Sequence, residues 1–499
     1  FSCYIWNISY VKELIRDIHK ILPDTIIWTG GPEVSYDPEN FLQEMPEVFG
    51  VMLGEGEETF RKLVEYYVNS KEEEGLYKIP GICFRRNEGT VNSGFPNVLD
   101  MDRLVFPYED LPSFSHKILY YESSRGCPFS CSYCLSSVDK KLRFKSLDLV
   151  KKELDIFLEA KVPQVKFVDR TFNCREDHAL EIWRYIQDHD NGVTNFHFEI
   201  GADLLTEKEI ALIRTMRPGL IQLEIGVQST NDKTLQEIRS GNIHQHLDLI
   251  AGLPWEDYSS FSRSFNQVYA LAPQQLQLGF LKVLKGSYMY EKAGDYGCIY
   301  KEKEPYEVLK TRWLSYGDII RLKSVEEMVE IYYNSGQFSH TVEAVVREFP
   351  DAFTFYEALG AFYEEKGYDT LSHSRIRRYE ILLEFLEERG TDSLEFYKEL
   401  MIFDLYAREN MKTRPSWAAK RDPYKEKIQA FYEGEKENPR YLTEYEQFTS
   451  RQMEKMTHLE IFTWDVLEGK KEQGFYPVLF DYQKRDPLTN DGLACQVEL

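Results

Sequence analysis

The first 290 residues alternate between short apolar runs and amphipathic stretches. From residue 118 onward, six apolar runs have the length of β-strands, and the segments between them carry apolar residues at helical spacing. Strands that are buried on both faces of a parallel sheet give such continuous apolar runs. The expected strands are Ile118–Glu122, Val165–Asp169, Phe196–Ile200, Ile221–Gly226, His246–Ile250 and Leu276–Val283. The pattern predicts six strand–helix units in a partial or full parallel barrel, with functional groups at the carboxyl ends of the strands.

Amphipathic stretches separate these strands. Thr206 and Glu209 have the spacing of a capping box, which predicts the start of the third helix. The segment between Gln228 and His244 is short for a complete crossover. The expected helices are Leu147–Ala160, Asp177–His189, Glu207–Met216, Asp232–Ile238 and Tyr258–Leu271.

A smaller strand–helix pattern precedes the six units. A helical stretch over Val11–Leu22 is followed by two apolar runs, Thr25–Thr29 and Val51–Leu53, and each run ends in a glycine turn. Buried strands that end in glycine turns indicate a doubly wound parallel sheet, whose ligands bind at the carboxyl ends of its strands. Because Phe1 lies in an apolar run of strand character, we expect that part of this domain precedes it.

The chain changes character again beyond residue 318. Long charged-amphipathic stretches, such as Arg375–Arg389 and Ser393–Ala407, predict a helical domain, and strand-like runs follow at Leu459–Val466 and Tyr476–Tyr482. We therefore expect an α/β protein with a Rossmann-like domain at residues 1–75 and a connector with a small hairpin at 76–117. The barrel is expected at 118–290 and a mostly helical C-terminal domain at 291–499.

Composition narrows the class of protein. The 499 residues include 60 Lys and Arg against 83 Asp and Glu, a formal net charge of −23. This balance argues against nucleic acid and anionic membranes as partners. Hydrophobic residues make up 42% and aromatic residues 14% of the chain, which excludes a disordered protein. No apolar run approaches the roughly 18 residues that a membrane-spanning helix needs.

Three of the eight cysteines are clustered, at Cys127, Cys131 and Cys134. The other five are scattered singly, which is poor material for a disulfide framework and indicates the reducing cytoplasm. The spacing Cys-x3-Cys-x2-Cys puts three thiolates on one loop, where they can hold three irons of a cubane and leave the fourth iron open. A zinc site normally recruits a fourth ligand, often from a second pair. No such pair stands nearby in the sequence, although structural zinc remains the alternative.

The cysteine motif follows the first barrel strand and resembles that of the radical S-adenosylmethionine (radical SAM) superfamily. The segments Phe167–Asn173, Leu223–Ser229 and Asp248–Pro254 also resemble this superfamily, and the likeness covers residues 118–286. The resemblance implies that Cys127, Cys131 and Cys134 ligate a [4Fe–4S] cluster. Its open iron would bind S-adenosylmethionine, and one-electron reduction would release a 5′-deoxyadenosyl radical.

The resemblance also implies further cofactor-binding residues at the barrel mouth. Tyr133 occupies the position of an aromatic residue beside the adenine, with a packed loop aromatic as the alternative. Glu199 and Gln228 are expected to bind the ribose or the methionine moiety, and the backbone of Ile250–Leu253 is expected to flank the adenine. A barrel ion pair is the alternative for Glu199, and Glu224 is equally suited to one. Asp169 and Arg170 face the same mouth or pair with each other. No catalytic residue is assigned.

The N-terminal turns resemble the cobalamin (vitamin B12) binding domain that precedes this barrel in one radical SAM subclass. Glycine turns at strand ends let the backbone approach a flat corrin closely. His19 does not stand in the usual cobalt-binding motif, because Leu22 replaces its glycine. A domain that has lost its cofactor is the alternative. The expected cobalamin-binding residues are Tyr4, Trp6, Asn7, Gly30, Gly31, Glu33, Val34, Ser35, Gly54, Glu55 and Gly56.

The resemblance favours a cobalamin-dependent radical SAM C-methyltransferase that acts through methylcobalamin. Rearrangement, cyclisation or ring contraction without methyl transfer is the nearest alternative. A methylthiotransferase would need three upstream cysteines, and only Cys3 and Cys83 precede the motif. A non-enzymatic iron–sulfur or cobalamin sensing protein is a further alternative. We expect a small-molecule or peptide substrate and an external one-electron reductant such as flavodoxin or ferredoxin. The C-terminal sequence resembles an uncharacterised domain of this subclass.

Overall fold

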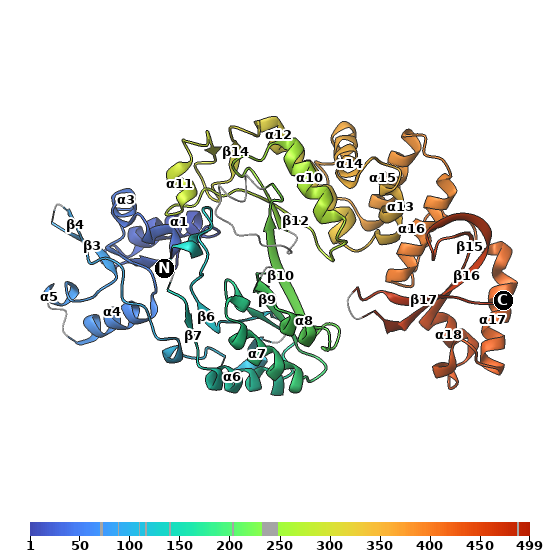
Figure 1. The fold of residues 1–499 in the computed structure, drawn as a ribbon, viewed down its shortest axis with the longest axis horizontal. Coiled ribbons are helices and arrows are strands. Elements are labelled where there is room, and N and C mark those ends of the chain that lie inside the picture. Colours follow the sequence, from blue (N-terminus) through green and yellow to red (C-terminus); the bar gives the residue numbers. More distant parts are fainter. Residues whose placement is uncertain are drawn as a thin grey trace. The chain divides into compact units, whose positions relative to one another are not determined.

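The computed structural model describes residues 1–69, 73–87, 89–108, 110–114, 117–138, 141–201, 204–231, 248–486 and 489–499. These residues form two compact units. Unit 1 comprises Phe1–Phe261 and Leu278–Ile319, and unit 2 comprises Ser262–Gln277 and Ile320–Leu499 (Figure 1). The expected helix Asp232–Ile238 and the start of the strand expected at His246 lie outside the described residues.

The first sheet of unit 1 has the order β1-β2-β3-β4. The parallel pair β1 and β2 is extended by a β3–β4 hairpin, so the hairpin expected after residue 70 belongs to the same sheet. One core lies between the sheet and α1, and a second core lies under α4, so helices cover both faces. The elements are α1 (Ile8–Ile21), β1 (Trp28–Gly30), α2 (Pro32–Ser35), α3 (Pro38–Glu44), β2 (Gly50–Met52), α4 (Glu57–Asn69), α5 (Glu73–Leu76), β3 (Ile82–Arg86) and β4 (Gly89–Asn92).

The second sheet has six strands in the order β12-β11-β10-β9-β8-β5. The four pairings recorded from β5 to β11 are parallel, and no pairing between β12 and β5 closes the sheet in the described part of the chain. The partial barrel is therefore confirmed. Its strands are β5 (Leu119–Tyr121), β8 (Gln164–Phe167), β9 (Asn195–Ile200), β10 (Ile221–Gln228), β11 (Asp248–Ala251) and β12 (Gln277–Phe280).

Helices lie along the outside of this sheet. In Figure 1, α6 (Leu147–Glu159), α7 (Glu176–Asp188) and α8 (Glu207–Ile213) lie side by side, and α10 spans Tyr258–Tyr269. The capping box predicted at Thr206 is present, because the Thr206 and Glu209 side chains each bind the other residue's backbone N–H. The core between these helices and the strands is rich in aromatic side chains, including the fully buried Phe167 and Trp183. Short connecting elements complete unit 1: η1 (Met101–Arg103), η2 (Leu111–Phe114), α11 (Tyr288–Lys292), β13 (Ile299–Tyr300) and β14 (Val308–Lys310).

Unit 2 is mostly helical, as predicted, and carries a three-stranded antiparallel sheet of order β15-β16-β17. Aromatic side chains of α14, such as Phe355 and Tyr356, are fully buried. The elements are α12 (Tyr316–Val329, which begins in unit 1), η6 (Glu330–Asn334), α13 (Ser339–Val346), α14 (Ala352–Lys366), α15 (Arg375–Glu388), α16 (Leu394–Arg408), η7 (Asp422–Tyr424), α17 (Lys425–Glu437), η8 (Thr443–Tyr445), α18 (Ser450–Met456), β15 (Thr457–Asp465), β16 (Lys470–Arg485) and β17 (Gly492–Gln496).

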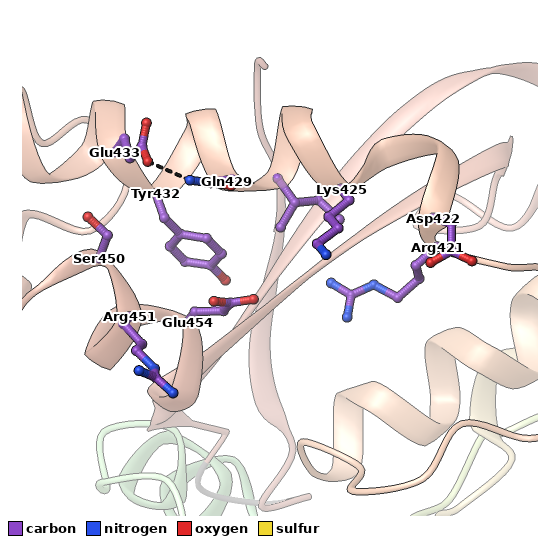
Figure 2. A pocket seen from close by; sticks show the side chains of 10 residues that line it. Arg421, Asp422, Lys425, Gln429, Tyr432, Glu433, Ser450, Arg451 and Glu454 are labelled. Carbon is purple, nitrogen blue, oxygen red and sulfur yellow. Dashed lines mark hydrogen bonds between the residues drawn. The ribbon is translucent and has the colours of Figure 1, made fainter.

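A cavity of about 530 Å³ lies between α17 and α18 (Figure 2). Three cations line it, Arg421, Lys425 and Arg451, together with three carboxylates, Asp422, Glu433 and Glu454. Arg421 already donates to the carbonyl oxygen of Leu459 at 2.8 Å. The lining charges therefore balance and select no ligand by charge. Across the described residues, every helix is too short or too polar to cross a bilayer.

Candidate functional site

The three clustered cysteines lie on one loop, residues 126–134, which we call the cysteine loop. It follows β5 and the two-residue strand β6 (Ser124–Arg125), which pairs with β7 (Arg143–Phe144). Gly126 has a φ of +95°, and a Cβ there would lie 2.8 Å from the carbonyl oxygen of Lys141. Only glycine fits this position without strain. The loop therefore emerges at the carboxyl end of the parallel strands, where the sequence predicts the site.

The three thiols differ in burial. Cys127 is buried, Cys131 and Cys134 are half-buried, and none of the eight cysteines, all of them among the described residues, is in a disulfide. No three His, Cys, Asp or Glu side chains within the described ranges converge as ligands of a single metal ion. In a cubane each thiolate binds a different iron, so the sulfurs do not need to converge on one point. Three thiols on one loop, none of them in a disulfide, thus fit the donor set of a cluster with one open iron.

Tyr133 lies within the cysteine loop. Its phenol is bound to Cys131 and lies near Cys134 and Asp248. Burial, followed by the charge of these neighbours, raises the pKa of Tyr133 well above its ordinary value. The side chain therefore stays a neutral hydrogen-bond donor. A cavity of about 250 Å³ adjoins the same loop, lined by Arg125 and Gly126 on one side and by Val168 and Arg170 on the other.

Glu199 and Glu224 face each other across the β9–β10 register, but their surroundings differ. Glu224 lies 2.8 Å from both His197 and Lys166. These partners, His197 first, lower the pKa of Glu224 to about 2, so Glu224 forms the barrel ion pair. Burial raises the pKa of Glu199, and no described residue makes a hydrogen bond that satisfies its carboxylate. Glu199 is thus the carboxylate that remains available to a ligand.

Gln228 ends β10 in a conformation that side chains rarely adopt, with a φ of +66°. Its Oε1 atom is buried and finds no hydrogen-bond partner among the described residues. A buried amide oxygen without a partner is costly, so Gln228 fits a polar ligand at this mouth. On the neighbouring strand β11, Ile250 is half-buried, and just beyond it Leu253 is fully buried beside Gly252, which has a φ of +95°. Because the Leu253 side chain is buried, a ligand at this tight turn would contact the backbone and not that side chain.

The sequence leaves open whether Asp169 forms an ion pair with Arg170. In the structure the two side chains do not pair. Asp169 is fully buried and accepts hydrogen bonds from Ser123 and Ser124, whereas Arg170 is exposed. Burial, opposed by these serine hydrogen bonds, raises the pKa of Asp169 to about 6.

The residues expected to bind cobalamin follow β1, β2 and the N-terminal segment, in which Ser2 forms a parallel bridge with Gly30 of β1. Tyr4 and Trp6 are 41% and 76% exposed, and their rings stack with centroids 5.5 Å apart. Asn7 braces this turn, because its side chain accepts from the Tyr4 N–H at 2.8 Å and donates to the Ser2 carbonyl oxygen at 3.0 Å. The arrangement presents a flat aromatic surface at the edge of the first sheet.

The first glycine turn is closely packed. Gly31 has a φ of +106°, and a Cβ there would lie 2.5 Å from the carbonyl oxygen of Cys3. The Ser35 hydroxyl donates to the Gly31 carbonyl oxygen at 2.8 Å, and Gly30 and Val34 are buried. The hydrogen bond and the burial together fix the conformation of the turn. In the second turn, Gly54 has a φ of +65°, whereas a Cβ at Gly56 would meet nothing within 4 Å.

Two of the expected cobalamin-binding residues already have partners. Glu33 is buried and accepts a hydrogen bond from Tyr306 at 2.8 Å. Glu55 accepts from Arg143 at 2.5 and 3.0 Å and lies 3.6 Å from Arg125. Arg125 immediately precedes the cysteine loop. The carboxyl edge of the first sheet is therefore joined to the start of the cysteine loop.

Family models match three parts of the chain. The radical SAM superfamily matches residues 121–253, the B12 binding domain matches residues 1–64, and a protein family of unknown function, DUF4080, matches residues 294–480. The radical SAM match includes all three loop cysteines. The chain carries a radical SAM domain after a B12-binding domain. The domain composition accounts for the three cofactors expected from the sequence, a [4Fe–4S] cluster, S-adenosylmethionine and cobalamin.

Curated relatives match the radical SAM protein over part of their length. An uncharacterized methyltransferase of Pyrococcus horikoshii is 31% identical over 34% of this chain and 38% of its own. The cobalamin-dependent radical SAM methyltransferase TokK of Streptomyces tokunonensis is 27% identical over 52% and 43%. The anaerobic magnesium-protoporphyrin IX monomethyl ester cyclase of Synechocystis is 27% identical over 46% and 48%. The chain thus spans less than half the length of these relatives.

The residues that join the two cofactor-binding domains carry no clear signal in the sequence. Arg143 and Arg125 meet Glu55 across 88 and 70 positions of sequence, and no periodic pattern marks such a pairing. The strands β6 and β7 are only two residues each, too short for a hydrophobic period. One signal is present: in a strongly acidic chain, Arg125 directly precedes the cysteine loop and Arg143 follows it within about ten positions.

Proposed function

We propose that the protein is a cobalamin-dependent radical SAM enzyme and that it acts as a C-methyltransferase. The observation that supports this best is the join between the two domains, in which Glu55 of the second glycine turn binds Arg143 and Arg125 at the base of the cysteine loop. Methyl transfer from a corrin to a substrate radical needs both cofactor sites close to one substrate. The join brings the carboxyl edge of the first sheet close to the base of the cysteine loop, as this reaction requires.

When bound, the cluster supplies the electron that cleaves S-adenosylmethionine, and cobalamin supplies the methyl group. The chain's own residues bind, orient and exclude water. We assign the cluster to the three loop cysteines and the adenine to Tyr133 and the backbone of Ile250–Leu253. Glu199 and Gln228 bind the ribose or methionine groups, since each has a buried or half-buried oxygen without a hydrogen-bond partner among the described residues.

We assign cobalamin to the edge of the first sheet. The stacked Tyr4 and Trp6 and the turns at Gly30–Ser35 and Gly54–Gly56 offer a flat surface and close backbone approach. In this proposal the side chains of Glu33 and Glu55 have a different role from the cobalamin contact expected from the sequence. Their carboxylates hold Tyr306 and Arg143, so they position the turns rather than contact the corrin with their side chains.

The names of the relatives support a methyltransferase over the alternatives, since two of the three relatives described above are named as methyltransferases. A cyclase among them keeps radical rearrangement without methyl transfer as the second candidate. We propose a small-molecule or peptide substrate and a flavodoxin or ferredoxin as reductant, in the reducing cytoplasm that eight cysteines outside any disulfide favour. We propose the domain limits 1–75, 118–290 and 291–499 around a connector whose β3–β4 hairpin completes the first sheet.

The test does not need the substrate. The anaerobically reconstituted protein is reduced with cobalamin and S-adenosylmethionine that carries a deuterated methyl group. Labelled methylcobalamin and 5′-deoxyadenosine are both expected. The Cys127→Ala variant should lose 5′-deoxyadenosine. Formation of 5′-deoxyadenosine without labelled methylcobalamin would support the cyclase-like alternative, and formation of neither would exclude both enzymes.

A further inference from the structure

Asp169 follows β8 and carries a carboxylate that the radical SAM chemistry does not require. It is fully buried. Its Oδ2 accepts the backbone N–H of Ser123 at 3.0 Å, and its Oδ1 accepts the hydroxyls of Ser123 at 2.7 Å and Ser124 at 2.5 Å. A buried carboxylate is tolerated only where hydrogen bonds occupy its oxygens. Here all three donors come from two consecutive residues that lead into the cysteine loop.

Ser123 and Ser124 are held from the opposite side as well. The Lys145 N–H donates to the Ser123 carbonyl oxygen at 2.8 Å, and Ser124 pairs with Phe144 of β7. Cys127 stands three residues after Ser124, a length of chain that spans at most about 10 Å. A shift of Ser124 therefore moves the first thiol of the loop.

His178 of α7 also contacts Ser123. It is buried, and its Nε2 lies 3.3 Å from the Ser123 hydroxyl oxygen. Burial lowers the pKa of His178 to about 4, so the ring is neutral at pH 7. Because the Ser123 hydroxyl donates its proton to Asp169, its oxygen accepts from the ring, which fits the tautomer that carries the proton on Nε2.

The same segment also reaches the first cysteine directly. Thr171 lies two residues after Asp169, it is buried, and its hydroxyl is 3.7 Å from the Cys127 sulfur. The chain from Asp169 to Thr171 thus holds the base of the cysteine loop at one end and contacts its first ligand at the other. Groups that orient a metal ligand in this way commonly set both the affinity for the metal and its electronic properties.

We propose that Asp169 is a positioning residue for the cluster: by holding Ser123 and Ser124, it fixes where the Cys127 thiolate meets its iron. The inference rests on the proposed function, since it requires that the loop cysteines bind a cluster. Asp169 acts through the loop and contacts no cofactor itself.

The test compares four anaerobically reconstituted proteins: the wild type, Asp169→Asn, Ser124→Ala and Glu209→Gln. Asparagine keeps the shape of Asp169 but replaces one acceptor oxygen with a donor. Ser124→Ala removes one hydrogen bond and leaves the buried carboxylate in place. Glu209 is also a fully buried carboxylate, but it caps α8 and does not contact the loop, so it reports the cost of any buried change. Iron release to a chelator and the electron paramagnetic resonance spectrum of the reduced cluster are measured well below the unfolding temperature.

We expect Asp169→Asn to release iron about tenfold faster than the wild type, at the lower end of the effect of such outer residues. Its spectrum should be broadened, Ser124→Ala should change in the same direction by less, and Glu209→Gln should match the wild type. If Asp169→Asn does not fold, the Ser124→Ala result decides. If Asp169→Asn and Ser124→Ala both show wild-type iron release and wild-type spectra, this inference is overturned and the proposed function is not. If the wild-type protein itself holds no cluster, both the inference and the proposed function are overturned.

Discussion

Glu55 is bound by Arg143 through two hydrogen bonds of 2.5 and 3.0 Å. Glu55 lies in the glycine turn after β2 of the B12-binding domain, and Arg143 lies on the strand that pairs with the base of the cysteine loop. Arg125, Glu57 and Glu122 extend the pair, with Arg125 lying 2.9 and 2.8 Å from the two carboxylates. One partly buried charge network thus links the two domains.

Glu55→Gln should weaken this link. The side chains of Glu55 and Arg143 are 19% and 13% exposed, so the charge-assisted hydrogen bonds are only partly screened by water. We expect the free energy of unfolding to fall by about 2 kcal/mol, as measured by urea titration. The matched control is Arg103→Gln, which removes the exposed Arg103–Glu58 ion pair and should cost less than about 1 kcal/mol. Equal losses in the two variants would contradict a special role for Glu55.

Gly126→Ala should disturb the cysteine loop itself. At a φ of +95° the new Cβ would lie 2.8 Å from the Lys141 carbonyl oxygen, a backbone atom that cannot rotate away. We expect the iron content after reconstitution to fall severalfold. Gly294→Ala is the control, because a Cβ at Gly294 meets nothing within 4 Å. Iron analysis and absorbance of the two variants decide the prediction, and a full complement of iron in Gly126→Ala would refute it.

Much of this architecture could be predicted from the sequence, because strands and helices leave a period. Five barrel strands agree with the prediction to within about three residues at each end, and the strand predicted at His246–Ile250 ends one residue before β11 (Asp248–Ala251) does. The loop cysteines were found because their spacing alone carries the signal. Glu33 and Glu55 were grouped with the cobalamin-binding turns, and the sequence could not show that their carboxylates bind Tyr306 and Arg143.

The contacts that the sequence could not reveal depend on tertiary structure. Asp169 and Arg170 are adjacent in sequence, yet one is fully buried and the other is exposed. Alternation along the chain permits either residue to face the mouth. Only the position of Ser123 and Ser124, 45 or more residues earlier, determines which carboxylate oxygens are satisfied.

Gln228→Met should change stability and ligand affinity in opposite directions. Methionine has nearly the same shape but removes the buried Oε1 that has no partner among the described residues. The free energy of unfolding without ligand should therefore stay unchanged or rise by about 1 kcal/mol. Affinity for S-adenosylmethionine, measured by equilibrium dialysis of the reconstituted protein, should fall about tenfold, which corresponds to about 1.4 kcal/mol. A loss of stability together with unchanged affinity would show that Gln228 serves the fold alone.

Stability should depend on pH through His458 of unit 2. His458 is buried, stacks on Tyr406 and lies 2.9 Å from Glu460. Burial, which outweighs the attraction of Glu460, lowers the pKa of His458 to about 4. Their contact is therefore a hydrogen bond from a neutral ring to a carboxylate at pH 7.

The sign of the effect follows from proton binding. Between pH 6.5 and 4 the unfolded chain protonates His458 and the folded chain does not, so stability falls as the pH falls through this range. The contribution is about 3 kcal/mol, fully present above pH 6.5 and lost near pH 4. The pKa of Glu460 is also lowered, chiefly through His458 and Arg414 against burial, which adds a further loss below about pH 4.5. Urea titrations at pH 7, 5.5 and 4.5 should show a shallower pH dependence in His458→Gln than in the wild type, while the exposed His189→Gln control keeps the wild-type slope. Parallel curves for the wild type and His458→Gln would rule out this assignment.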